Sequence, residues 1–218
     1  NVNPLELARA FFDKSYLSHA TAIFYHGLTE QVVRSFYISK ERPTPHQKQT
    51  TTEISNETLR VEFMKPARRT TNYCQYKGYT YHLVERGYAG RSGVIEMHLE
   101  FENKNVPVEI TNLERTLVDC IISPHYAGGL LEVIKAFKNA KQKLKHQKLY
   151  EQYQSISCIY PYWQRIGLVL EKLVGVQMAQ HWHDYFGKPK SDFYIDKEYR
   201  GTWDYDQRWQ VYYPKGVF

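Results

Sequence analysis

The spacing of apolar residues changes along the chain from a helical period to alternation. The first twelve residues open with Asn3-Pro4-Leu5-Glu6, a capping box with proline at the first helical position, and continue with one apolar face, which predicts a helix. Ser18 is a suitable cap for a second short helix, which Gly27 would end. Alternation then predicts strands over 35–41, 58–64, 79–84, 94–101 and 106–111, and a polar loop over 42–53.

After residue 111 the helical period returns. Thr111 and Glu114 match a second capping box, which predicts a helix ended by Ser123-Pro124. Gly128-Gly129 separates it from further predicted helices at 130–140, about 146–155 and about 162–174. The aromatic tail, 191–213, predicts one or two strands. The sum is an α+β fold, with a mostly antiparallel sheet, helices grouped N-terminally and after the sheet, and a short β tail.

One main domain is expected over 1–176, with a sheet part at about 30–111 and a helical part at about 112–176. Residues 177–218 form an aromatic-rich β extension packed on that domain. Within the helical part, Arg115 and Asp119 are four residues apart and are expected to pair on one helix face. Gly167 predicts that another backbone approaches the last helix closely, since glycine costs a helix about 1 kcal/mol.

The positive charge is concentrated. The chain carries 29 Lys and Arg against 23 Asp and Glu, a net charge of +6. Six lysines and no acid lie between Lys135 and Lys148, so this segment accounts for the whole net charge. A second excess runs from Arg60 to Arg91. Such clusters favour a polyanion or an acidic protein as partner, and a solvated helix face is the alternative.

Basic residues alternate with tyrosines between Arg68 and Tyr79, a pattern that suits phosphates and stacked bases. An edge strand beside a polar loop would give the same composition. Contacts of this kind position a nucleic acid without reading its sequence. The candidate polyanion-binding residues are Arg68, Arg69, Lys77, Lys135, Lys138, Lys141, Lys143 and Lys145.

Catalytic and metal-binding patterns are weak. The three cysteines are far apart, which disfavours a thiolate zinc site and is typical of a reduced, cytoplasmic protein, with Cys120 expected to be buried. His181 and His183 would face different directions on a helix. Glu102-Asn103-Lys104 matches half of a nuclease metal site, but no second carboxylate is evident. The sequence therefore predicts no enzyme, no metal, no cofactor and no membrane span.

Several segments, taken in order, resemble the AbiEi family of antitoxins and transcriptional regulators. These segments cover about residues 1–175, and each alone has low specificity. They are Pro4-Leu5-Glu6-Leu7-Ala8, Tyr16-Leu17-Ser18, Ala22, His26-Gly27-Leu28-Thr29, TNLERTLVDCI (111–121), Gly128-Gly129 and QRIGLVLEKLVG (164–175).

The resemblance implies an antitoxin and transcriptional regulator domain of a type IV toxin–antitoxin system, active in abortive phage infection. Its implied partners are operator DNA and a nucleotidyltransferase-like toxin, which the family neutralises with or without stable contact. The family's N-terminal winged helix is expected to be absent, because nothing before Asn3 could form it. The alternatives from the residues themselves are a defence-associated metal-dependent nuclease using Glu102 and Lys104, and a pure protein-interaction module.

Overall fold

The structure, a computed structural model, describes residues 2–43 and 55–218, which form an α+β fold with two sheets. This confirms the predicted fold class. The strands of the larger, six-stranded sheet follow the order β3-β4-β2-β1-β6-β5. They are β1 (Tyr16–Leu17), β2 (Ser35–Glu41), β3 (Tyr73–Tyr76), β4 (Tyr79–Arg86), β5 (Val94–Phe101) and β6 (Lys104–Thr111).

The larger sheet is mixed. Antiparallel pairings predominate in it, as predicted, but the sequence did not predict its two parallel pairings. β2 pairs in parallel with β4, and β1 pairs in parallel with β6. The pairings of β1 with β2, β3 with β4 and β5 with β6 are antiparallel. Parallel pairs need a long crossover, and the connection from β2 to β4 contains a helix and β3.

Two short helices, α1 (Pro4–Ala10) and α2 (His19–Tyr25), precede β2. The capping box of α1 is confirmed, since Asn3 Oδ1 accepts from the Leu5 backbone at 2.9 Å while Glu6 accepts from the Asn3 backbone. Ser18 occupies the N-cap position of α2, but its hydroxyl bonds to His19 and Ser39 instead of the helix backbone. Gly27 ends this helix at φ 68°, as predicted.

Residues 58–64, predicted as a strand, belong to helix α3 (Asn56–Met64). Leu59 and Phe63, four residues apart, are buried, whereas Val61 between them is 48% exposed. The Ser55 side chain caps the helix by accepting from the Thr58 backbone at 3.2 Å. Three apolar residues at alternate positions fit a helical face as well as a strand when the run is this short.

The polar loop predicted over 42–53 falls mostly outside the described residues.

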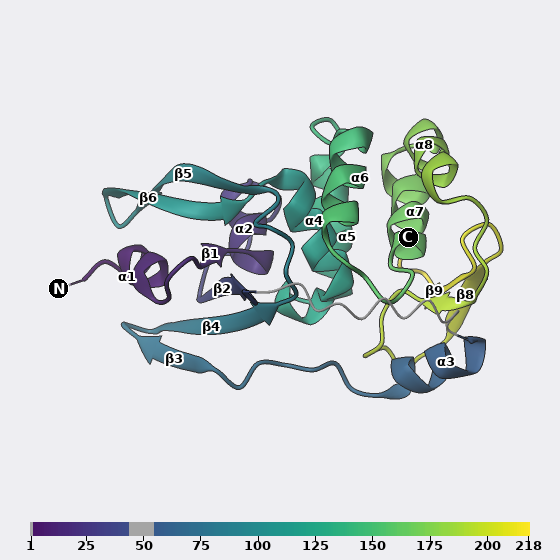
Figure 1. The fold of residues 1–218 in the computed structure, drawn as a ribbon, viewed down its shortest axis with the longest axis horizontal. Helices are drawn as coiled ribbons and strands as arrows, with labels where there is room; N and C mark the ends of the chain where they lie inside the picture. The colour runs from purple at the N-terminus through teal and green to yellow at the C-terminus, as the bar shows by residue number, and fades with distance from the viewer. Residues whose placement is uncertain (1, 44–54) are drawn as a thin grey trace.

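Helices follow the larger sheet, as Figure 1 shows. They are α4 (Leu113–Ile122), α5 (Leu130–Ala140), α6 (His146–Ser155), α7 (Trp163–Val169) and α8 (Val176–Phe186), with a 3₁₀ turn at Pro124–Tyr126 and a π-helical stretch at Leu170–Val174.

The predicted capping box at Thr111 was wrong by one residue. Asn112 caps α4 by accepting from the Arg115 backbone at 2.8 Å, while the Thr111 hydroxyl bonds to Thr116.

The aromatic tail forms a second, three-stranded sheet in the order β7-β9-β8 within the described residues. Its strands are β7 (Phe193–Tyr194), β8 (Trp203–Asp206) and β9 (Val211–Pro214). Trp182, Phe193 and Trp209 are fully buried in the same hydrophobic cluster as the helices. Figure 1 places this sheet at the end of the molecule opposite to α1.

Gly167 of α7 accommodates a side chain, not the neighbouring backbone that the sequence predicted. A Cβ at this position would lie 2.1 Å from the Trp209 ring. The Trp209 indole is held there because its Nε1 donates to Glu171 Oε2 at 2.8 Å. The tail is therefore packed into the helical part of the fold through one glycine.

Candidate anion-binding surface

A buried ionic network joins α4 to β4. Arg115 Nε lies 3.1 Å from both carboxylate oxygens of Asp119, which confirms the predicted pair, and both side chains are buried. Arg86 donates to the same carboxylate. Burial alone would raise the pKa of Asp119, but Arg115 and Arg86 outweigh it and lower that pKa. The carboxylate therefore stays ionised and fixes both arginines.

His19 and Ser18 extend this network, and their hydrogen bonds exclude a nucleophile pair. Arg86 donates to His19 Nε2 at 2.9 Å, so the opposite nitrogen, Nδ1, carries the proton and donates to Ser18 Oγ at 2.8 Å. Burial, aided by Arg86, lowers the pKa of His19 to about 3. A histidine that donates to the serine cannot accept its proton, so the pair is part of the scaffold.

The lysine segment forms an exposed corner between α5 and α6. Lys135 is paired with Glu132 at 2.7 Å. The other five lysines are exposed, and within the described residues none of them has an ion-pair partner. They are Lys138, Lys141, Lys143, Lys145 and Lys148, and we call them the lysine corner.

Favourable interaction with a helix dipole accounts for the positions of only some residues of the lysine corner. Lys138 and Lys141 stand at the C-terminal end of α5, where a cation is favourable. Lys145 is the N-cap of α6 and Lys148 lies in its first turn, where the helix dipole makes a cation unfavourable by about 0.3–1 kcal/mol. Two of the five lysines therefore cost the fold stability in the absence of an anion.

The second group of predicted residues is divided among different roles. Arg69 forms an ion pair with Glu198, in which Nη2 lies 2.9 and 2.8 Å from the two carboxylate oxygens. Lys77 lies in the β3–β4 turn, where its Nζ donates to the Val2 backbone at 3.2 Å. The Arg68 side chain is exposed and has no hydrogen-bond or ion-pair partner among residues 2–43 and 55–218. Of the three, only Arg68 presents an unengaged cation.

The two predicted groups do not meet. In Figure 1 the α5–α6 connection lies at the upper edge, and the connection from α3 to β3, which contains Arg68 and Arg69, lies at the lower edge. Lys77 lies further along, at the tip of the β3–β4 hairpin. The lysine corner and Arg68 are therefore separate positive surfaces.

Glu102 and Lys104 do not form a metal site. Glu102 and Asn103 are the two turn residues between β5 and β6, at φ 48° and 59°, and Lys104 lies 3.6 Å from the Glu6 carboxylate. His181 and His183 lie on α8. Among the described residues, no group of three or more His, Cys, Asp or Glu side chains could hold a metal ion. The nuclease alternative therefore gains no support from geometry.

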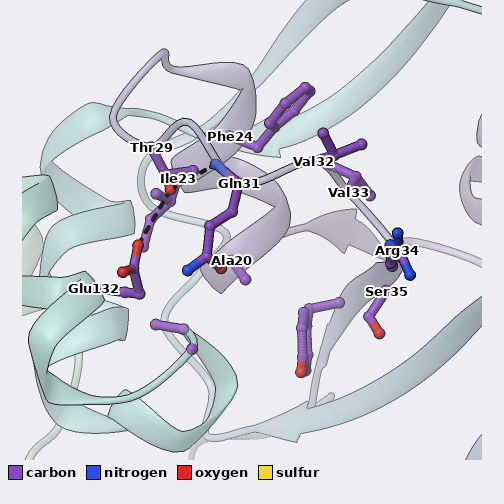
Figure 2. A pocket seen from close by; sticks show the side chains of 13 residues that line it. Ala20, Ile23, Phe24, Thr29, Gln31, Val32, Val33, Arg34, Ser35 and Glu132 are labelled. Atoms are coloured by element: carbon purple, nitrogen blue, oxygen red, sulfur yellow. Dashed lines mark hydrogen bonds between the residues drawn. The ribbon is translucent and has the colours of Figure 1, made fainter.

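A pocket of about 270 Å³ lies between α2, residues 29–35 and the start of α5. Figure 2 shows Thr29 between the Glu132 carboxylate and the Gln31 backbone, with Thr29 Oγ1 donating to Glu132 Oε2 at 3.2 Å. The carboxylate is also held by Lys135. The Glu132 carboxylate is thus already bound by groups of the chain itself.

The three cysteines are free thiols, and Cys120 is buried as predicted. No helix among the described residues has both the length and the apolar character to cross a bilayer.

The comparisons with known proteins support the fold and leave the function open. No protein-family model and no curated protein matches the chain. Among solved structures, the chain is similar to the RV2827C protein from Mycobacterium tuberculosis, with a TM-score of 0.61 and 13% sequence identity. The match covers 95% of this chain and 64% of that one. At this identity the similarity shows a shared fold only.

Proposed function

We propose that this chain is a non-enzymatic antitoxin and transcriptional regulator domain of a type IV toxin–antitoxin system. It acts in the cytoplasm, where it binds operator DNA through the lysine corner and counteracts a nucleotidyltransferase-like toxin. The observation that carries the proposal is the lysine corner itself: five exposed lysines without an ion-pair partner in the described part of the chain. The segments that resemble AbiEi proteins supply the scaffold that holds it.

The positions of the lysines favour an anionic partner. A phosphate near Lys145 and Lys148 would interact favourably with both the lysines and the N-terminal end of α6, because the backbone N–H groups and the helix dipole point toward it. Without that anion, the same two lysines oppose the dipole. DNA contacts of this type depend on phosphate and give affinity without base recognition.

The salt dependence of DNA binding tests the proposal. Each phosphate contact contributes about 0.9 to the slope of log K against log salt concentration, so replacing Lys138, Lys141 and Lys143 with Gln should flatten the slope by about 2–3. Anisotropy titrations of a labelled duplex over a range of salt concentrations would measure it. Lys135→Gln is the matched control, since Lys135 is already neutralised by Glu132, and it should change the slope little. An unchanged slope in the triple variant would refute the lysine corner as the DNA contact.

The antitoxin part has a separate test in cells. Co-expression with the nucleotidyltransferase-like toxin encoded beside this chain's gene should restore growth. Rescue without measurable DNA affinity would instead identify a protein-interaction module. DNA binding without rescue would leave only the regulator part of the proposal.

A further inference from the structure

A groove of about 670 Å³ lies beside Arg68, and none of the residues of the lysine corner lines it. It is bounded by residues 65–72, the end of β4, the end of α4 and residues 159–162. The charged residues that line it are five cations, Lys65, Arg68, Arg69, Arg86 and Lys197, and two carboxylates, Glu62 and Glu85. This volume is in the range of about 300–1,000 Å³ that small-molecule sites occupy.

Three of the five cations are already paired. Lys65 binds Glu62, Arg69 binds Glu198, and Arg86 binds the buried Asp119. Arg68 and Lys197 have no carboxylate partner in the described residues, and the Lys197 Nζ lies 5.5 Å from the centre of the Phe63 ring. Two cations of the groove are therefore free to bind an anion.

A further buried cation lies behind the groove wall. Arg165 is fully buried and donates to the backbone carbonyls of Ile121 and Tyr194, at 2.9 and 2.7 Å. Its guanidinium also lies 4.9 Å from the centre of the Tyr162 ring, and Tyr162 lines the groove. No carboxylate among residues 2–43 and 55–218 forms an ion pair with Arg165, although Asp196 lies near enough to raise its pKa, so part of the charge of Arg165 adds to the positive potential of the site.

The pKa values of neighbouring groups report this potential. Burial, with Arg165, Arg68 and Lys65 acting in the same direction, lowers the pKa of Lys197 although Glu62 opposes it. Burial together with Arg69 lowers the pKa of His125, another lining residue, to about 4. An anion in the groove would relieve the repulsion among these cations.

Aromatic and apolar residues form the rest of the wall. Tyr126, Tyr160 and Tyr162 line the groove, and the neighbouring Ile159 is 64% exposed. Tyrosine rings beside cations are the combination that binds nucleotides, since the ring stacks on a base while the cations bind phosphate. A bare inorganic anion would leave this wall unused.

We propose that the groove binds a nucleoside phosphate, with the phosphates near Arg68 and Lys197 and the base against Tyr160. The proposal goes beyond DNA contact at the lysine corner and does not depend on it. A free nucleotide and the phosphorylated end of a nucleic-acid strand carry the same chemical group, and the experiment separates them.

Isothermal titration calorimetry of the whole chain tests the site with four probes in parallel: ATP, CTP, a 5′-phosphorylated dinucleotide and tripolyphosphate. The dinucleotide is too short to span the lysine corner. Saturable binding of ATP or CTP would identify a free nucleotide, and binding of the dinucleotide alone would identify a strand end. Tripolyphosphate should bind more weakly than the better nucleotide, because it has no base.

Variants of the two free cations locate the binding. Arg68→Gln and Lys197→Gln should each weaken the affinity about tenfold, the loss of one charge-assisted hydrogen bond. Tyr160→Ala should weaken the binding of the nucleotide and leave the affinity for tripolyphosphate unchanged. Lys141→Gln, on the lysine corner, is the matched control and should bind as the original chain does. The Arg68 side chain has no hydrogen-bond or ion-pair partner in the part of the chain that the structure describes, so its variant should keep the melting temperature of the original chain.

Three results would overturn the proposal. The first is that ATP, CTP and the dinucleotide all fail to show saturable binding. The second is that Arg68→Gln and Lys197→Gln both leave the affinity for the bound probe unchanged. The third is that tripolyphosphate binds with the same affinity as the nucleotides. None of them bears on DNA binding at the lysine corner, which is measured with a long duplex and other variants.

Discussion

Replacement of Gly167 by alanine should destabilise the fold, although alanine is the better helix former. The added Cβ would lie 2.1, 2.2 and 2.5 Å from three ring atoms of Trp209. That ring cannot easily move aside, because it is fully buried and its Nε1 is hydrogen-bonded to Glu171. The indole, and with it the neighbouring strand β9, would have to shift.

The expected size follows from two opposing terms. Overpacking of a core costs about 1–3 kcal/mol, and a direct overlap with a rigid ring belongs at the upper end of that range. The gain in helix propensity from glycine to alanine is about 1 kcal/mol. The net loss is thus about 2 kcal/mol, which lowers the melting temperature of a chain of this size by about 4–8 °C.

Thermal and urea unfolding followed by circular dichroism would measure this loss. Gly87→Ala is the matched control, because no atom lies within 4 Å of a Cβ there, and its stability should be unchanged or slightly higher. In a Trp209→Leu background the cost of Gly167→Ala should largely disappear, as two contacting residues are not additive. A melting temperature of Gly167→Ala equal to that of the original chain would refute the packing of Trp209 on α7.

Three more predictions concern charge. His19 has a pKa of about 3 in the fold against about 6.5 when unfolded, so stability should fall as the pH drops from 6.5 toward 3, by about 2 kcal/mol at pH 5, and urea titrations of His19→Gln should show a flatter profile. Asp119→Asn removes the buried carboxylate that Arg86 and Arg115 share, leaving Arg115 only the longer ion pair with Glu41 at 3.6 Å among the described residues, and should cost about 3–5 kcal/mol by the same assay. A loss below 1 kcal/mol would contradict the buried network. Lys148→Gln should raise the free energy of unfolding by about 0.3–1 kcal/mol while weakening DNA binding. A decrease in both stability and DNA affinity would show instead that Lys148 stabilises the fold.

Elements with a strong local signal could be predicted from the sequence to the residue. β2, β5 and α6 have the predicted bounds, because each carries its own period or is bounded by clear breaks. The helix at 56–64 could not be separated from a strand by its apolar spacing alone. Its two buried residues, Leu59 and Phe63, pack into the helical core, and these contacts with residues distant in the sequence favour the helix.

Sheet topology could not be predicted because strand pairing is not local. Alternation identifies β2 and β4 as strands, yet it carries no information on whether they run in the same direction. That direction depends on where the connection through α3 and β3 returns the chain. The pairing of β5 with β6 is local by contrast. The two strands are joined by a two-residue turn, Glu102 and Asn103, so they can only run antiparallel to each other.

The basic residues illustrate the same limit at the candidate site. Lys135 was expected to face a polyanion, but it pairs with Glu132 three residues away on α5, a spacing at which charged side chains on a helix meet. The engagement of Arg69 by Glu198 could not be predicted from the sequence, because 129 residues separate them. A cation whose charge is neutralised by a distant acid has the same sequence signature as an unpaired cation. Counting bases therefore overstates the second surface, and in the lysine segment it includes Lys135, which is paired with Glu132.

The basic residues therefore fall into two physical groups. Arg86 and Arg115 are bound to Asp119 inside the fold, where they contribute cohesion and little external potential. The lysine corner holds its charge in exposed positions, two of which oppose a helix dipole. Exposed lysines that oppose the dipole of α6 are not explained by the stability of the fold, and the proposed anionic partner at the start of α6 would account for them.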